Sequence, residues 1–134
     1  MIIYSVITTY HLLEAIVHKV NYNLNEHSVL FVSNWLVEKY PWYEKLDSFF
    51  DEVYVFDGSY RFQNYKKTVS YLNSYFKNLF KKLKFDLNKA TEINVFGAEH
   101  AFGAFLFVNK VPVNFWEEGA GALSKKESMC ELFA

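Results

Sequence analysis

The chain has little cysteine and almost no net charge. Its 134 residues include one cysteine, Cys130, so an intramolecular disulfide framework is excluded and the chain suits a reducing compartment. The formal net charge is -1, so no broad basic field is present to attract nucleic acid. These absences argue against a disulfide-stapled secreted domain and against a nucleic-acid-binding protein.

Long apolar runs and a charged leader are also missing. No apolar run approaches the length of about 20 residues that a transmembrane helix needs. The N-terminus has no positively charged stretch before Ile2 and Ile3, so it does not resemble a signal peptide. We therefore predict a cytoplasmic protein.

The common cofactor and nucleophile motifs are absent as well. The sequence contains no GxGxxG dinucleotide fingerprint, no GxxxxGK[ST] phosphate-binding loop and no GxSxG elbow. No spacing of cysteine and histidine is typical of zinc. We therefore predict no metal and no resident cofactor.

Apolar and aromatic residues are plentiful. They make up 51% and 20% of the chain, which at 134 residues is enough for one domain with a real core. With ten tyrosines and fourteen phenylalanines, we expect some rings to line a second surface, such as a facing domain.

Short apolar runs alternate with helical periodicity along the chain. Strands are predicted at residues 2–7, 28–32, 53–56, 93–96 and 113–116. Helices are predicted at residues 11–22, 35–46 (interrupted near Pro41), 65–87 and 101–108. This alternation predicts an α/β fold, a Rossmann-like three-layer α/β/α sandwich whose five-stranded parallel sheet has the order 3-2-1-4-5.

Two of these predicted helices carry further information. The end of helix 65–87 is rich in lysine (Lys77, Lys81, Lys82 and Lys84). Cations are favourable at a helix C-terminus; the alternative is a basic surface in peripheral contact with the inner face of the cell membrane. Helix 101–108 is apolar on all sides, which predicts that it is buried or faces another domain.

Polar residues and glycines follow the first, fourth and fifth predicted strands. The carboxyl ends of these strands meet near the switch point of such a sheet. They are Thr8, Thr9, Tyr10, His11, Gly97, Glu99, His100, Glu117, Glu118 and Gly119. Thr8 or Thr9 is a candidate helix cap, and His11 has either a capping or packing role or a catalytic one. His100 begins a helix, where the dipole disfavours a protonated imidazole.

The acid pair is the strongest candidate for chemistry. An apolar strand ends in Glu117 and Glu118, and Gly119 and Gly121 then let the backbone approach a ligand closely. A carboxylate placed there suits a general base. The simpler alternative is a charged strand end followed by an ordinary glycine turn.

Two segments resemble one enzyme group. Residues 7–15 (ITTYHLLEA) resemble the "TPYHLL-A" start of bacterial sialyltransferases and polysialyltransferases (glycosyltransferase family 52 and relatives), with Thr9 where proline is common. Residues 115–121 (FWEEGAG) resemble the "[DE][DE]G" motif of the same enzymes. The order and separation of the two motifs also fit. The resemblance covers the N-terminal half of a two-domain GT-B architecture.

The resemblance implies that two domains bind the two substrates. Residues 1–124 would form the acceptor-side domain, and residues 125–134 a tail or the start of a linker to a C-terminal domain. That second domain would bind most of a nucleotide-sugar donor such as CMP-sialic acid, so this chain alone would be inactive. The acceptor would be a glycan of a capsule or lipooligosaccharide. Residues 8–11 would line the site that binds it. Glu117 or Glu118 would be the general base, with no metal required.

Two other classes of protein remain open from the residues. One is a stand-alone flavodoxin-like binding or regulatory module that uses the same sheet edge. The other is a scaffold domain whose aromatic rings pack against a partner chain, and an exposed domain interface would also favour a homo-oligomer.

Overall fold

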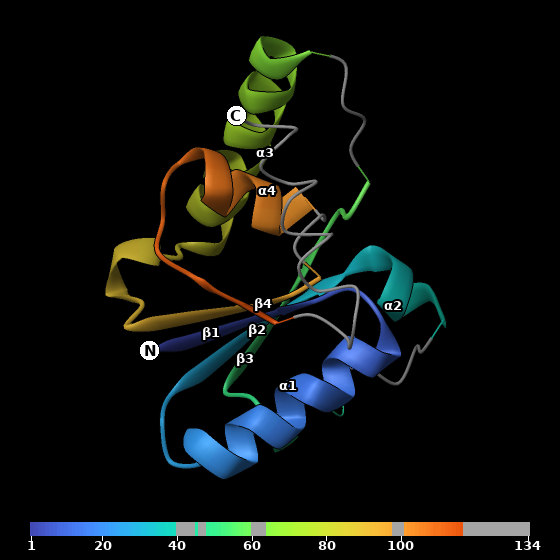
Figure 1. Ribbon diagram of the computed structural model, residues 1–134, viewed down its shortest axis with the longest axis vertical. Coiled ribbons are helices and arrows are strands. Elements are labelled where there is room, and N and C mark those ends of the chain that lie inside the picture. Colours follow the sequence, from blue (N-terminus) through green and yellow to red (C-terminus); the bar gives the residue numbers. More distant parts are fainter. Residues whose placement is uncertain (40–44, 46–47, 60–63, 98–100, 117–134) are drawn as a thin grey trace.

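Five parallel strands in the described part of the chain form one sheet, in the order β3-β2-β1-β4-β5 (Figure 1). The computed structural model of the chain describes residues 1–39, 45, 48–59, 64–97 and 101–116. The strands are β1 (Ile2–Val6), β2 (Ser28–Ser33), β3 (Glu52–Phe56), β4 (Glu92–Phe96) and β5 (Asn114–Trp116). The predicted α/β Rossmann-like fold and its strand order are confirmed.

Helices cover both faces of the sheet. Helix α1 (Thr9–Tyr22) lies on one face, and α3 (Tyr65–Leu83) and α4 (Ala101–Val108) lie on the other (Figure 1). The short helix α2 (Asn34–Lys39) follows β2 directly. Each face has its own core, because odd and even residues of a strand point to opposite sides. The fold is therefore the predicted three-layer sandwich.

The core under α3 and α4 is built from aromatic rings. Phe102 stacks on Phe31 with ring centroids 4.8 Å apart and meets Phe76 edge-on at 5.3 Å. Helix α4 has the predicted bounds, and its residues from Ala101 to Leu106 are all buried. The prediction that this all-apolar helix is buried is thus confirmed.

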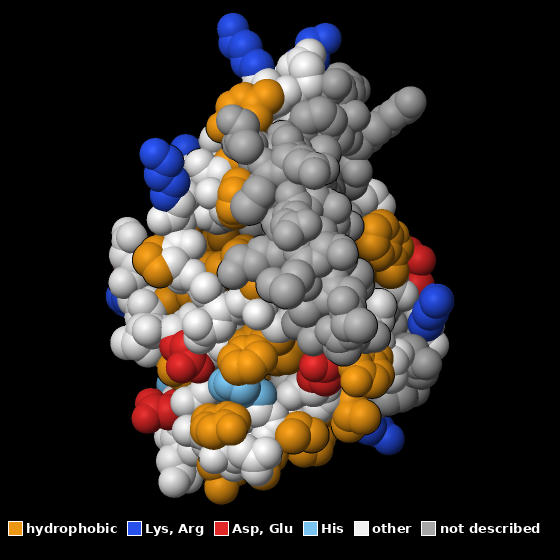
Figure 2. Space-filling model, viewed as in Figure 1, with side chains coloured by type: hydrophobic (Ala, Val, Ile, Leu, Met, Phe, Trp, Pro, Cys, Tyr) orange, Lys and Arg blue, Asp and Glu red, His pale blue; other side chains and the backbone are white. Residues whose placement is uncertain are grey.

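The end of α3 differs from its prediction. The helix stops at Leu83, four residues before the predicted end, and Leu87–Lys89 form a separate 3-10 turn. Lys84 takes a left-handed conformation with φ 54°, and the Phe85 N–H donates back to the Phe80 carbonyl at 2.9 Å. This turn satisfies the last carbonyls and ends the helix. The lysines near the end of α3, namely Lys77, Lys81, Lys82 and Lys84, are exposed to solvent. In Figure 2, blue side chains also stand out at the opposite end of the helix, where α3 begins.

The remaining boundaries shift by one or two residues. Ile7 lies just beyond β1, Val113 lies just before β5, and α1 begins at Thr9 rather than at residue 11. The predicted helix over 35–46 is described as α2 up to Lys39, and Pro41 lies outside the described residues. In the described part of the chain, no helix has the length and apolar character required to cross a bilayer.

Candidate functional site

The loop between β1 and α1 is fixed by Thr8. This residue is the N-cap of α1, with extended backbone, and its Oγ1 accepts a hydrogen bond from the His11 N–H at 3.2 Å. Of the two candidate caps, Thr8 is the one that acts. Thr9 and Tyr10 are exposed at the carboxyl edge of the sheet, the edge at which the parallel strands end.

His11 packs beneath this edge against Gly97. The imidazole is 6% exposed, and a Cβ built on Gly97 would lie 2.8 Å from His11 Cε1. Gly97 also has a φ of 84°, in the region that favours glycine. The ends of β1 and β4 therefore meet as predicted, and this contact favours the packing interpretation of His11.

Strand β5 reaches the same edge through a backbone hydrogen bond. The Gly97 N–H donates to the Trp116 carbonyl at 3.3 Å. Trp116 is the residue before Glu117 in the sequence. The predicted convergence of the first, fourth and fifth strands is thus confirmed for the described residues. The other predicted site residues, namely Glu99, His100, Glu117, Glu118 and Gly119, lie outside them.

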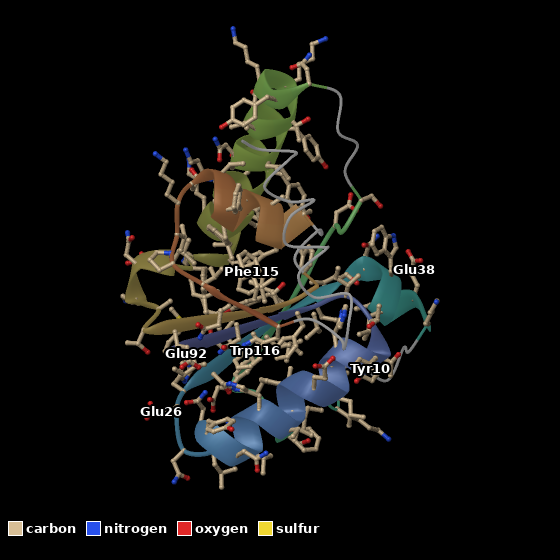
Figure 3. The ribbon with its side chains drawn as sticks, viewed as in Figure 1. Tyr10, Glu26, Glu38, Glu92, Phe115 and Trp116 are labelled. Carbon is tan, nitrogen blue, oxygen red and sulfur yellow. The ribbon has the colours of Figure 1, made fainter. Side chains whose placement is uncertain are left out.

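A pocket of about 370 Å³ lies at the carboxyl edge, between the start of α1 and α2. We call it the edge pocket; it is lined by Ile7, Thr8, Thr9, Trp35, Leu36, Glu38 and Lys39. The Trp35 side chain is 42% exposed. In Figure 3, Tyr10 at the start of α1 and Glu38 on α2 lie on this same side of the molecule. Hydroxyl, charged and indole groups thus line one small cavity.

Two hydrogen bonds and one close contact join the elements around the edge pocket. Ser33 Oγ donates to the Ile7 carbonyl at 2.9 Å, which ties the end of β2 to the end of β1. Asn34 Oδ1 accepts from the Gly58 N–H at 3.0 Å. A Cβ on Gly58 would lie 3.3 Å from Trp35 Cζ3, so the indole rests on this glycine. Gly58 therefore supports the indole of Trp35 beside the pocket.

Sequence reasoning missed the contribution of α2 to this pocket. Trp35, Glu38 and Lys39 were predicted only as part of a helix. A signal was present, because Ser33 and Asn34 follow a buried strand that neighbours the first strand in the predicted order.

A hydrogen-bonded network lies behind Trp116, on the face of the sheet that carries α1. The Trp116 Nε1–H donates to Asn94 Oδ1 at 3.0 Å, and Asn94 Nδ2 donates to Glu92 Oε2 at 2.8 Å. Asn23 Nδ2 lies within hydrogen-bond distance of both Glu92 Oε2 and the Tyr4 hydroxyl, at 3.0 and 2.9 Å. Glu92 and Trp116 are labelled close together in Figure 3. The network fixes the orientation of the last described residue before the acid pair.

His18 on α1 closes this network into a ring. Its Nδ1 lies 3.0 Å from the Tyr4 hydroxyl, and its imidazole lies 5.1 Å from the Trp116 ring system. Burial lowers the pKa of His18, and the carboxylate of Glu92 offsets part of that shift. Burial also raises the pKa of Tyr4. Both groups are therefore neutral near pH 7, which suits an uncharged hydrogen bond between them.

Comparison with known proteins does not assign the chain to a family. No protein family model, no curated protein and no solved structure matches the chain. Within the described ranges, no three histidine, cysteine or acidic side chains are grouped so that they would hold a metal ion.

Replacing Gly97 with alanine tests the junction of β1 and β4. We expect a loss of about 2–4 kcal/mol in the free energy of unfolding, because a left-handed backbone and a 2.8 Å contact with His11 both oppose the new methyl group. Urea denaturation measures the loss. Gly58→Ala is the matched control; its Cβ would contact Trp35 at 3.3 Å, and we expect less than about 1.5 kcal/mol. Equal losses in the two variants would contradict the predicted strain at Gly97.

Proposed function

We propose that this chain is the acceptor-binding domain of a glycosyltransferase of the sialyltransferase-like kind. The observation that carries the proposal is the edge pocket, which combines Thr8, Thr9 and the exposed indole of Trp35 at the carboxyl edge. A sugar offers hydroxyl groups to polar side chains and an apolar C–H face to an aromatic ring. A small set of placed polar groups around an apolar surface is what such recognition requires.

The proposed chemistry is an inverting displacement at the anomeric carbon of a nucleotide-activated sugar. The acceptor hydroxyl oxygen forms the new bond to that carbon, the bond to the nucleotide breaks, and the nucleotide leaves with the electron pair. Glu117 or Glu118 takes the proton from the acceptor hydroxyl. The hydrogen bond between Gly97 and Trp116 supports this role, because it ties the strand that precedes the acid pair to the same edge as the pocket.

The proposed donor is a CMP-activated sialic acid or a related nucleotide sugar, held mainly by a second domain outside these 134 residues. The proposed acceptor is a glycan of a bacterial capsule or lipooligosaccharide. Closure of the two domains would exclude water, which would otherwise hydrolyse the donor. The resemblance of residues 7–15 and 115–121 to that enzyme group supports these assignments.

Binding of a glycan to the isolated chain tests the pocket directly. Titration calorimetry with short galactose- and sialic-acid-terminated oligosaccharides should give a dissociation constant in the range of about 0.1–1 mM, as for small ligands in open sites. We expect Trp35→Ala to weaken this binding by about 10-fold, because the indole face supplies most of the apolar contact.

A matched control separates this effect from general loss of aromatic surface. Tyr71 on α3 is 45% exposed and does not line the edge pocket, so Tyr71→Ala should leave glycan binding unchanged. Equal affinity in wild type and Trp35→Ala, or no glycan binding at any concentration tested, would contradict the proposal. Binding of a small non-glycan metabolite instead would favour the stand-alone binding module.

A further inference from the structure

His18 lies at the centre of the hydrogen-bonded network behind Trp116. Its imidazole is half-buried and packs against three aromatic rings, those of Tyr4, Tyr22 and Trp116, with centroid separations of 5.6, 4.9 and 5.1 Å. Figure 3 shows Trp116 beside α1, the helix that carries His18. His18 therefore links α1 both to β1 and to the end of β5.

The donors and acceptors of this network follow from one carboxylate. A carboxylate only accepts, so Asn23 presents its amide nitrogen to Glu92 Oε2 at 3.0 Å. The same nitrogen donates its second hydrogen to the Tyr4 hydroxyl oxygen at 2.9 Å. The hydroxyl hydrogen of Tyr4 then points to His18 Nδ1, 3.0 Å away. His18 Nδ1 is therefore an acceptor, and the neutral ring carries its proton on Nε2.

A proton on His18 Nδ1 is incompatible with this arrangement. The new N–H would point at the Tyr4 oxygen, which already accepts from Asn23, and the hydroxyl hydrogen of Tyr4 would lose its acceptor. Tyr4 is 0% exposed. A buried hydroxyl without an acceptor costs more than an exposed contact between a cation and an aromatic ring gains. The network therefore accommodates the neutral imidazole and not the charged one.

The charged groups around His18 oppose this preference only in part. Glu92 on β4 favours a positive imidazole, but burial has the larger effect, and the pKa of His18 is lowered. The other titratable groups on the adjacent elements are Glu14 and Tyr22, one turn away on α1, and Tyr4 on β1, while β5 presents none. In the described part of the chain, the balance favours the neutral ring near pH 7.

We propose that His18 is a pH-sensitive latch on the end of β5: its protonation breaks the hydrogen bond with Tyr4 and removes the imidazole from the indole of Trp116. Trp116 then keeps its hydrogen bond with Asn94 and its stacking on Phe96, but it loses its contact with His18 on α1. Release requires a pH below about 6.5, the ordinary pKa of histidine. The end of β5 is therefore held to α1 at neutral pH and freed from it in acid. The inference does not depend on the proposed function.

Proton NMR of the 134-residue chain between about pH 7.5 and pH 5 tests the latch. We expect the indole N–H resonance of Trp116, assigned with Trp116→Phe, to shift with the same midpoint as the ring protons of His18. His18→Asn places an amide oxygen near the position of Nδ1, where it accepts from Tyr4 at every pH, so the shift of the Trp116 resonance should disappear. Tyr4→Phe removes the hydroxyl, so His18 should take up its proton at a higher pH than in wild type.

Urea denaturation gives a second readout of the same proton. Because the pKa of His18 is lowered in the folded chain, the unfolded chain binds the proton more readily. The contribution to stability is therefore fully present above about pH 6.5 and is lost as the pH falls below it. Between about pH 7.5 and pH 5.5, the unfolding constant should rise about 3- to 10-fold more in wild type than in His18→Asn.

His27→Asn is the matched control. His27 lies just before β2, where its Nε2 is 2.7 Å from Glu52 Oε2, so this variant should keep the pH response of Trp116. Circular dichroism checks that each variant is folded. A Trp116 resonance that ignores pH, a response retained in His18→Asn, or the same His18 midpoint in wild type and Tyr4→Phe would each overturn the proposal. Glycan titration at about pH 7.5 reports on the proposed function separately.

Discussion

Replacing the general base of the proposed reaction with glutamine is expected to lower sugar transfer by about 10²–10⁴-fold. The candidates are Glu117 and Glu118. Glutamine has nearly the shape of glutamate, but its amide does not accept the proton of the acceptor hydroxyl at neutral pH. Binding of the donor should be retained, since the lost group acts only on the acceptor. The assay uses the enzyme that contains this chain, with CMP-sialic acid and a panel of other activated sugars.

The acid pair supplies its own matched control. Consecutive residues of a strand point to opposite faces, so we expect one variant to lose transfer and the other to retain most of it. The loss should fall on kcat, with little change in KM, because the base acts mainly in the transition state. Full turnover in both Glu117→Gln and Glu118→Gln would remove the acid pair from the mechanism. Hydrolysis of the donor without transfer would place the defect on the acceptor side.

The sheet order was predictable because its signals are local. Each strand is a short run rich in β-branched or aromatic residues, and each helix has its own apolar period. Right-handed crossovers then leave few topologies for five parallel strands. The burial of helix α4 was equally predictable, since eight consecutive residues without a polar side chain have to be buried.

The features that were missed depend on contacts between distant residues. The network behind Trp116 joins three strands and α1, and the hydrogen bonds of Asn94 are not visible in a local pattern. A partial signal existed, because Glu92 and Asn94 place polar groups on one face of an otherwise apolar strand. The early end of α3 was missed because Lys84, not glycine, adopts the left-handed turn.

The outer face of α1 illustrates a further limit. The sequence predicts an amphipathic helix from Leu12, Leu13, Ala15 and Val17, but it does not say which of these apolar residues meet the sheet. Both faces of the helix are apolar, so the periodicity fits either assignment. Only the packing against β1 separates the buried Leu12 and Ala15 from the exposed Leu13 and Val17.

Phe102→Ala is expected to lower the free energy of unfolding by about 3–5 kcal/mol. The ring is fully buried in the centre of the aromatic core, in contact with Phe31 and Phe76. Its ring neighbours come from β2, β3 and α3, so the cavity left by the missing ring is enclosed by several elements that do not collapse together.

Urea denaturation of Phe102→Ala tests this expectation, with a lower midpoint and an unchanged slope. Phe102→Leu keeps much of the volume and should lose less than half as much stability, while Tyr71→Ala on the exposed side of α3 should lose less than about 1 kcal/mol. Equal losses in Phe102→Ala and Tyr71→Ala would contradict a core centred on this ring. Because Phe102 lies on the face opposite α1, the folded fraction of Phe102→Ala should bind glycans like wild type, which separates the stability of the scaffold from the chemistry at its carboxyl edge.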